Sequence, residues 1–290
     1  MSHTPVILVL GDQGQLGRSL WAAPLPPWLE LAGRDVDQVD ITDPSQIRRA
    51  LDETSCALVV NAAAYTAVDR AEAEPQAAYA VNEAGAGNVA SACAAHGLPL
   101  IHLSTDYVFD GALDRPYGPD DPANPLSVYG ASKLAGEKAV AQANPRSMIL
   151  RTAWLFSPHG ANFVKTMLRL GRNNGAVSVV DDQVGCPTGA AGLASVVLTV
   201  ASAMLNGQDD GFGIFHYCGA EPVSWCGLAR EVFDAAHMAV SVEPIPSAAL
   251  DQPARRPAFS ALDCSHLTGV YGIMAQDWRA ELAAVVTALG

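Results

Sequence analysis

The chain has 290 residues, half of them hydrophobic, and its formal net charge at pH 7 is −13. This length and apolar content suffice for a sizeable buried core. Because an acidic chain is repelled by phosphate backbones and anionic lipid, nucleic acid and membrane surfaces are poor candidate partners.

The N-terminus and the longest apolar stretch bear on where the protein works. Residues 1–5 lack the basic start of a signal peptide. The apolar stretch around residues 190–205 is interrupted by Ser195, Thr199 and Ser202. It is also shorter than the ~20 residues that a bilayer requires. We therefore expect a buried helix there and a cytoplasmic protein.

Short apolar runs alternate with helical segments through the first half of the chain. The runs predict strands at residues 6–10, 29–32, 57–60, 98–103 and 148–150, with helices at 75–96 and 129–141 among the intervening segments. This alternation is typical of a Rossmann-type, doubly wound parallel sheet, an α/β fold.

The pattern loosens after about residue 151, where prolines cluster and helices are predicted at 162–170, 189–205 and 225–237. We expect residues 1–155 to form the Rossmann domain, joined by a strand or two from later in the sequence. Residues 156–290 should form mainly a smaller substrate-binding lobe.

A glycine-rich motif follows the first predicted strand directly. Gly11, Gly14 and Gly17 have the spacing G-x-x-G-x-x-G. Glycine permits a tight turn and a close approach of the backbone to a pyrophosphate, and the following helix aims its N-terminal amides at that anion. Because the motif stands between a strand and a helix, it predicts a dinucleotide site rather than only a β–α turn.

The end of the second strand normally decides which dinucleotide binds. Arg34 stands there, and an arginine can bind the extra phosphate of NADPH, whereas an acidic residue favours NADH. Asp35 follows immediately, so NADPH is favoured while NADH and a solvated loop pair stay open. Asp40 and Ile41 would bracket an adenine, the carboxylate accepting from its amino group and the apolar side chain packing on its face.

Tyr129 and Lys133 are spaced so that both side chains lie on one face of a helix. Reduction of a ketone requires a proton as well as a hydride. A phenol with an ordinary pKa of ~10 becomes usable when a neighbouring ammonium stabilises the phenolate. Thr105 ends the fourth strand, at the sheet edge where ligands bind, and would donate to the substrate oxygen.

Further blocks of the sequence resemble the dTDP-4-dehydrorhamnose reductase family, within the extended short-chain dehydrogenase/reductases. They lie nearly end to end, at residues 61–72, 104–111, 129–137, 151–154, 162–168, 182–188 and 256–257. The resemblance implies reduction of the C4 ketone of dTDP-4-dehydro-L-rhamnose to dTDP-L-rhamnose by NADPH, or by NADH. Residues 1–155 would then bind NAD(P), and residues 156–290 mainly the sugar nucleotide.

The resemblance also implies roles for individual residues. Tyr129 would be the proton donor, Thr105 would orient it, and Lys133 would bind the cofactor and polarise Tyr129. The expected cofactor contacts are Gly14, Gln15 and Leu16 at the pyrophosphate, Asp40 and Ile41 at the adenosine, and Ala64, Tyr65 and Thr66 at the nicotinamide. The expected sugar contacts are Thr105, Asp106 and Trp154. Trp154 is also interpretable as a core residue between the two lobes.

The sequence departs from the family at two points. The family often has histidine where Tyr65 stands, and some members hold a dimer-bridging magnesium ion through acidic residues that we do not find here. We therefore predict no metal and leave a homodimer open.

Two other functions remain as alternatives. A related 4,6-dehydratase or 4-epimerase acting on a nucleotide sugar is one, although a dehydratase would need a glutamate next to Asp106 and none is present. A non-catalytic, reductase-like regulatory subunit is the other. The intact Thr105, Tyr129 and Lys133 argue against it.

Overall fold

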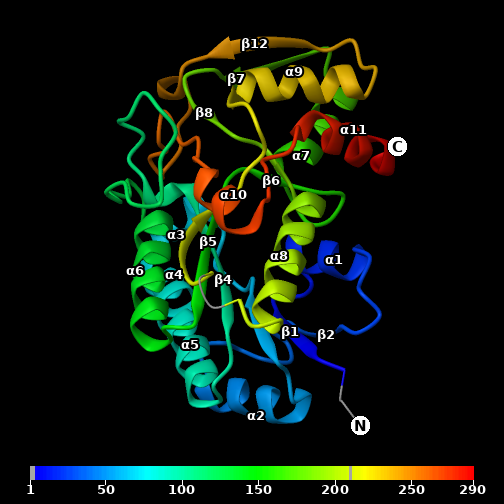
Figure 1. Ribbon diagram of the computed structural model, residues 1–290. Coiled ribbons are helices and arrows are strands. Elements are labelled where there is room, and N and C mark those ends of the chain that lie inside the picture. The colour runs from blue at the N-terminus through cyan, green and yellow to red at the C-terminus, as the bar shows by residue number, and fades with distance from the viewer. Residues whose placement is uncertain (1–3, 209–210) are drawn as a thin grey trace.

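The centre of the protein is a six-stranded parallel sheet in the computed structural model, which describes residues 4–208 and 211–290 (Figure 1). Residues 1–3, on which the expectation about a signal peptide partly depends, lie outside the described residues. From one edge the strands are β2 Glu30–Arg34, β1 Val6–Leu10, β3 Leu58–Asn61, β4 Leu100–Thr105, β5 Ser147–Thr152 and β10 Gly213–His216. Every neighbouring pair is parallel, which confirms the predicted fold class.

The strand order defines where a ligand can bind. From β1 the chain passes to β2 on one side and then to β3 on the other, so the winding reverses between β1 and β3. In open α/β sheets ligands bind beyond the carboxyl ends of the strands at this reversal. The loops after β1 and β3 are therefore the place to look for a dinucleotide site.

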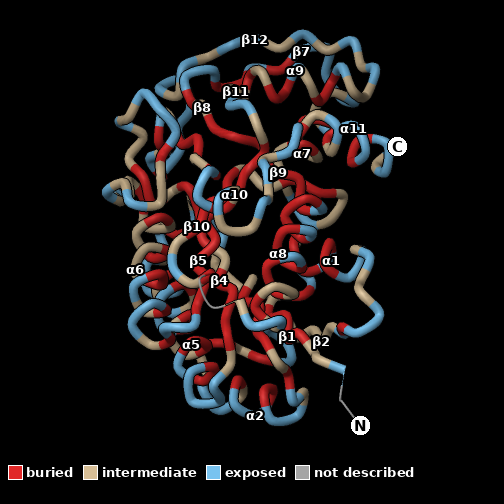
Figure 2. Tube along the Cα trace, viewed as in Figure 1, coloured by how far each residue is buried: buried red, intermediate tan, exposed pale blue. Residues whose placement is uncertain are grey.

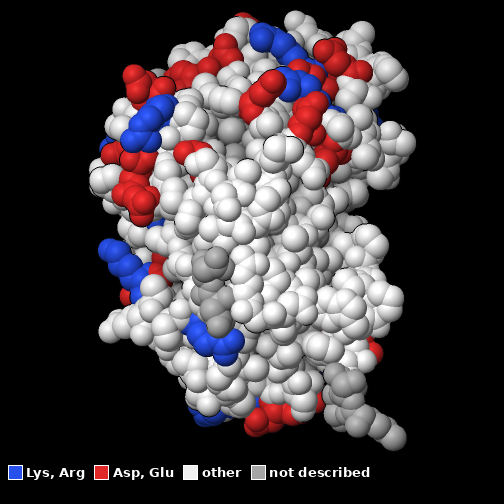
Figure 3. Space-filling model, in the orientation of Figure 1, with Lys and Arg blue, Asp and Glu red and all other residues white. Residues whose placement is uncertain are grey.

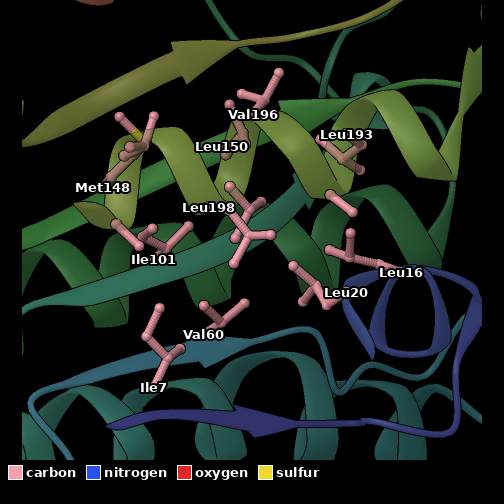
Figure 4. Close-up of a cluster of buried hydrophobic side chains, with 14 of the residues drawn as sticks. Ile7, Leu16, Leu20, Val60, Ile101, Met148, Leu150, Leu193, Val196 and Leu198 are labelled. Carbon is pink, nitrogen blue, oxygen red and sulfur yellow. The ribbon is translucent and has the colours of Figure 1, made fainter. Parts of the chain in front are cut away.

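Helices cover both faces of the sheet because successive strand residues point to opposite sides. Ile7 and Val9 face α1 Gln15–Ala22 and α8 Ala190–Leu205, and Figure 4 shows this apolar cluster. Leu8 and Leu10 face the opposite layer of α2 Pro44–Thr54, α5 Ala86–Ala95 and α6 Val128–Ala143. The long apolar segment at 190–205 is thus a helix packed against the sheet.

The segment 75–96, predicted as one helix, is interrupted by a wider turn. It consists of α4 Pro75–Tyr79, the π-helical turn η1 Ala80–Gly85 and α5. Such turns are frequent at functional sites. Here the turn contains Asn82, whose buried side chain bonds to the loop after β3 and to Ser132 on α6.

A smaller lobe with its own apolar core lies above the sheet (Figures 1 and 2). It contains α7 Phe163–Asn173, α9 Trp225–Ala235, α11 Trp278–Leu289 and the parallel pair β7 Ala176–Val180 and β12 Ser241–Ile245. Two short pairs lie beside it, β6 Leu155–Phe156 with β9 Thr188–Gly189 and β8 Val184–Gly185 with β11 Val223–Ser224. The remaining short helices are α3 Val68–Ala73, η2 Asp106–Val108, η3 Ser247–Ala249 and α10 Ser265–Tyr271.

Charge is unevenly distributed over the surface. On the face shown in Figure 3 the middle of the molecule carries few charged side chains, and acidic and basic groups gather mainly over the upper lobe and its neighbouring loops. Among the described residues, no helix has the length and apolar character needed to cross a bilayer.

Candidate active site

The loop after β1 and the helix that follows it require glycine at two positions. Gly11 has a φ of +80°, and a Cβ atom there would lie 2.7 Å from the backbone nitrogen of Ala63. A Cβ atom on Gly17 would collide with the backbone of Asp12. The glycine spacing therefore lets this loop pack tightly against both α1 and the loop after β3.

The N-terminus of α1 is arranged to receive an anion. Its N-cap, Gly14, offers no side chain to cover the first backbone amides. The side chain of Gln15 is directed elsewhere, since its Oε1 accepts from Ser157 Oγ and Asn162 Nδ2, both at 2.9 Å. The backbone N–H groups at Gln15 and Leu16 thus fit a pyrophosphate. Gln15 also ties this loop to the start of α7.

Arg34, the last residue of β2, and Asp35, which follows it, are both partly buried and have different partners. Asp35 Oδ2 accepts from the backbone nitrogen of Gln13 at 2.9 Å, so this carboxylate helps to hold the glycine loop. Arg34 donates one guanidinium N–H to the carbonyl of Gly33 at 2.8 Å. Asp12 lies against Gly33, and its Oδ1 is buried without a hydrogen-bond partner among the described residues.

Asp40 and Ile41 have structural partners of their own. Asp40 Oδ1 accepts from the backbone and the hydroxyl of Thr42, both at 2.8 Å. The side chain of Ile41 is 4% exposed and packs in the core below α2 and α5. A contact of either residue with adenine remains a prediction.

The loop after β3 is held by the π-helical turn. Asn82 Oδ1 accepts from the backbone nitrogen of Tyr65 at 2.8 Å, and Asn82 Nδ2 donates to the Tyr65 carbonyl at 3.0 Å. The Tyr65 hydroxyl donates to Glu74 Oε2 at 2.9 Å. The backbone of Ala64, Tyr65 and Thr66 is therefore fixed beside the glycine loop, where these residues were predicted to meet nicotinamide.

The helix that carries the tyrosine–lysine pair is positioned by several contacts at its start. Ser127, its N-cap, accepts from the backbone nitrogen of Gly130 at 3.2 Å, and Glu72 accepts from Val128 at 2.8 Å. A Cβ atom on Gly130 would collide with the Tyr107 carbonyl. Glycine at this position lets α6 approach η2 closely, and Tyr129 comes to lie beside the carboxyl end of β4.

Tyr129 is a partly buried phenol whose pKa is raised, so it holds its proton at neutral pH. Burial raises its pKa to about 12, a hydrogen bond with Thr105 lowers the pKa, and the nearby carboxylate of Asp106 raises it. The ring of Tyr107 meets that of Tyr129 edge-on, with centroids 5.6 Å apart. Thr105 and Tyr129 thus lie together at the end of β4, and the role of Thr105 in orienting Tyr129 stays a prediction.

Lys133 is buried one helical turn from Tyr129. Its Nζ donates to the Leu103 carbonyl at 2.6 Å and lies 3.5 Å from His102 Nε2. Burial lowers the pKa of Lys133 to about 8, and Glu137 partly offsets this. Burial, and then the charge of Lys133, lowers the pKa of His102, so the imidazole is neutral. His102 lies in a predicted strand and was not singled out, because nothing in the sequence separates it from a core residue.

Asp106 is almost completely buried, with 1% of its surface exposed. Its Oδ1 accepts from Thr105 Oγ1 at 3.0 Å, and its Oδ2 accepts from Ser260 Oγ at 2.6 Å. Burial raises the pKa of Asp106 to about 6, although these hydrogen bonds lower it. Both carboxylate oxygens thus have protein partners, and a contact of Asp106 with the sugar remains a prediction.

Trp154 lies half-buried where the two lobes meet. Its ring stacks on that of Trp225, and its backbone has a φ of +47°, a conformation that bulky residues rarely adopt. A Cβ atom on Gly185 would lie 2.6 Å from the Trp154 ring, so glycine makes room for the indole. Both interpretations of Trp154 therefore have support in its surroundings.

Two ion pairs near the site were not predicted. Arg151 and Glu137 form a buried pair at 2.7 Å that links β5 to α6. Arg256 pairs with Asp69 at 2.7 Å and hydrogen bonds to Tyr107. Arg256 lies in a block that carries the family resemblance, and that was the only signal available for it. Within residues 4–208 and 211–290 no cluster of three acidic, histidine or cysteine side chains is arranged to hold a metal ion.

The glycine loop, the strand-end threonine and the tyrosine–lysine pair meet at one edge of one sheet. This combination defines an oxidoreductase of the short-chain dehydrogenase type.

Comparison with known proteins identifies the family. Residues 5–290 match the family model described as RmlD substrate binding domain. The chain is 43% identical over 288 residues to the dTDP-4-dehydrorhamnose reductase of Sinorhizobium fredii, covering 98% of this chain and 97% of that one. The chain therefore belongs to the dTDP-4-dehydrorhamnose reductase family.

Solved structures agree with this assignment. The crystal structure of a dTDP-4-dehydrorhamnose reductase from Clostridium acetobutylicum is 37% identical and superposes with a TM-score of 0.92, covering 98% of this chain and 99% of that one. The enzyme from Bacillus anthracis, solved in complex with NADP, is 33% identical, with the same TM-score of 0.92 and the same coverage of 98% and 99%.

Proposed function

We propose that this protein reduces the C4 ketone of dTDP-4-dehydro-L-rhamnose to dTDP-L-rhamnose with NADPH. The observation that carries the proposal is the position of Tyr129, hydrogen-bonded to Thr105 and one helical turn from the buried Lys133. The family membership supports the substrate, and the NADP bound to the Bacillus anthracis relative supports the cofactor.

The residues present fit a nicotinamide dinucleotide. The glycine loop leaves room for a pyrophosphate at the uncapped N-terminus of α1, where Gln15 and Leu16 would hold it. Arg34 would face the phosphate on the adenosine ribose, and Lys133 would hold the nicotinamide ribose. When bound, the cofactor supplies the hydride.

The chain's own groups then handle the proton. Because its pKa is about 12, Tyr129 holds its proton at neutral pH and acts as an acid toward the carbonyl oxygen. The Lys133 ammonium and the Thr105 hydroxyl stabilise the phenolate left behind. Burial of the Thr105 and Lys133 side chains strengthens these interactions, since water screens them little.

In this proposal the two lobes bind different ligands, the cofactor and the sugar nucleotide. The Rossmann lobe comprises residues 1–155 together with α8 and β10, which complete the sheet layer. The rest of 156–290 forms mainly the sugar-nucleotide lobe, with Trp154 at the junction covering the apolar face of the deoxysugar. A homodimer and a cytoplasmic location stay predictions of the sequence.

The direct test is oxidation of NADPH when purified protein receives dTDP-4-dehydro-L-rhamnose, with the sugar product identified by NMR. Tyr129→Phe is the control, and we expect it to lower kcat by about 10²–10⁴-fold while NADPH binding persists. The same assay with NADH in place of NADPH measures the cofactor preference. NADPH binding without turnover would instead support a regulatory subunit, and a near-normal rate in Tyr129→Phe would overturn the proposed mechanism.

A further inference from the structure

We propose that Asp106, positioned by Ser260, is the proton store that restores the proton of Tyr129 through the hydroxyl of Thr105 after each reduction. This inference rests on the proposed function, because it concerns the turnover of the same site. It adds two residues to the chemistry: Ser260, which no sequence motif indicated, and Asp106 in a role other than sugar binding.

The geometry is a chain of short contacts that begins outside the Rossmann sheet. Ser260 lies in a segment whose backbone pairs with the ends of two other segments, through Ser260 N to the Val184 carbonyl at 2.8 Å and Tyr117 N to the Ala261 carbonyl at 2.8 Å. Its side chain is 2% exposed and donates to Asp106. The C-terminal part of the chain therefore supplies a fixed donor to the catalytic centre.

The direction of each hydrogen bond at Thr105 follows from the number of hydrogens available to donate. The Thr105 hydroxyl has a single hydrogen. While Asp106 is ionised, Thr105 donates this hydrogen to Asp106 at 3.0 Å, its oxygen accepts from the backbone nitrogen of Tyr107 at 3.1 Å, and the protonated Tyr129 hydroxyl is the donor in its bond with Thr105. Once Asp106 has bound a proton, its carboxyl donates to Thr105 instead, and the Thr105 hydrogen is free to be donated to the Tyr129 phenolate.

The surroundings of Asp106 suit a group that gains and loses a proton. Its partners are hydroxyl and backbone donors rather than a cation, and the titratable groups facing it are Tyr129 on α6 and Tyr107 on η2. Arg256 lies behind Tyr107 and is already paired with Asp69. A carboxyl with a pKa of about 6 is a good donor near neutrality, since a donor works best near the operating pH.

The proton step balances without any further reactant. Tyr129 gives its proton to the substrate oxygen and becomes a phenolate. The Thr105 proton then moves to Tyr129, and the proton of the Asp106 carboxylic acid moves to Thr105, so one proton is transferred and Asp106 is left ionised. Asp106 regains a proton from water between turnovers. Transfer toward Tyr129 is downhill, because the phenol has the higher pKa.

The first experiment compares single and multiple turnovers in Asp106→Asn, which keeps the shape but cannot store the proton. Tyr129 starts each cycle protonated, so the rate of a single turnover with excess enzyme should fall less than steady-state kcat does. Steady-state kcat should fall by about tenfold or more, the usual range for a lost acid. Equal losses in both measurements, or no loss in either, would overturn the proposal.

The second experiment uses Ser260→Ala, with Ser104→Ala as the matched control. Ser104 is also a buried serine that donates to a buried carboxylate, Glu137 Oε1 at 2.5 Å, but on the neighbouring ion-pair network. Because the Ser260 bond lowers the pKa of Asp106, its removal should raise that pKa in a carboxyl-carbon NMR titration of the protein alone.

The pH above which kcat declines should move upward in Ser260→Ala together with the Asp106 pKa, and Ser104→Ala should shift neither. A kcat profile that stays fixed while the Asp106 pKa moves would overturn the relay. Failure of the proposed function is distinguishable, because wild-type protein would then not reduce the sugar at all, while the NMR titration would still report on Ser260 and Asp106.

Discussion

Trp154 and Trp225 lie flat against each other, with ring centroids 3.4 Å apart and planes 3° from parallel. Phe163 of α7 packs against Trp225, with ring centroids 4.6 Å apart. The stack joins the segment after β5 to the start of α9, and so joins the sheet to the smaller lobe. Trp154 remains half-buried, so one indole is placed both to hold the lobes and to face a ligand.

Trp154→Ala separates these two roles. We expect a stability loss of about 1–3 kcal/mol, less than for a fully buried tryptophan, because part of the ring is exposed. The sugar-nucleotide KM should rise, or kcat fall, with NADPH affinity mostly retained. Trp225→Ala is the matched control, since it removes the same stack. Equal kinetic defects in both variants, or a large fall in Tm with normal kinetics, would leave Trp154 a packing residue.

Arg34 carries the prediction for cofactor choice. Arg34→Ala should weaken NADPH binding more than NADH binding, because a charge-assisted contact with the ribose phosphate contributes on the order of 1–3 kcal/mol. The selectivity ratio, measured by titration with each cofactor, should then fall by roughly tenfold or more. Arg18→Ala is the control, because Arg18 bonds to Gln13 in the same loop. Equal losses for both cofactors in Arg34→Ala would contradict the assignment.

The sequence predicts the sheet and its reactive edge because both depend on local patterns. Buried parallel strands appear as continuous apolar runs, and the spacing of Tyr129 and Lys133 fixes their common face on any helix. The five strands of residues 6–150 are all present. The π-helical turn at Ala80–Gly85 was not predicted, because one added residue per turn leaves an alanine-rich pattern almost unchanged.

Other parts of the site depend on tertiary contacts that no periodicity encodes. Ser260 reaches Asp106 across 154 residues of chain, and Arg256 reaches Asp69 across 187. His102 has the sequence context of any strand residue, and only its contacts with Lys133 and Asn61 distinguish it. Residues of this kind become visible when the fold brings distant segments together.

The buried pair of Glu137 and Arg151 gives a prediction about stability. Both side chains are 3% exposed, so Arg151→Met would leave an unpaired carboxylate in the interior, at a cost of about 3–5 kcal/mol. Arg49→Met is the control, because its ion pair with Glu53 lies at the surface and contributes at most about 1 kcal/mol. Urea denaturation measures the loss of stability in each of these two variants. The double variant Glu137→Gln with Arg151→Met should recover part of the loss, and similar losses for Arg49→Met and Arg151→Met would contradict this account.

Lys133 should reduce the stability of the protein while serving its chemistry. Its pKa is about 8 in the folded protein against 10.5 as the ordinary value, so between these pH values the unfolded chain binds more protons. Stability therefore rises with pH across this window, and below about pH 8 the fold carries the full cost of the buried ammonium, about 3 kcal/mol by this shift. Lys133→Met would remove this cost, but it would also remove the hydrogen bond from Nζ to the Leu103 carbonyl.

Lys133→Met should consequently lower activity and NADPH affinity, yet unfold at equal or higher denaturant concentration than wild type at pH 7. That advantage should shrink as pH rises from about 8 toward 10.5, where the wild-type lysine becomes neutral in both states. The residual activity should have a higher pH optimum, because Tyr129 has lost its cation. Lys138→Met, an exposed position on the same helix, controls for loss of positive charge and should show no such trend. Denaturation curves at several pH values decide the matter: parallel stability profiles for wild type and Lys133→Met would mean that Lys133 is not held as a costly buried ammonium.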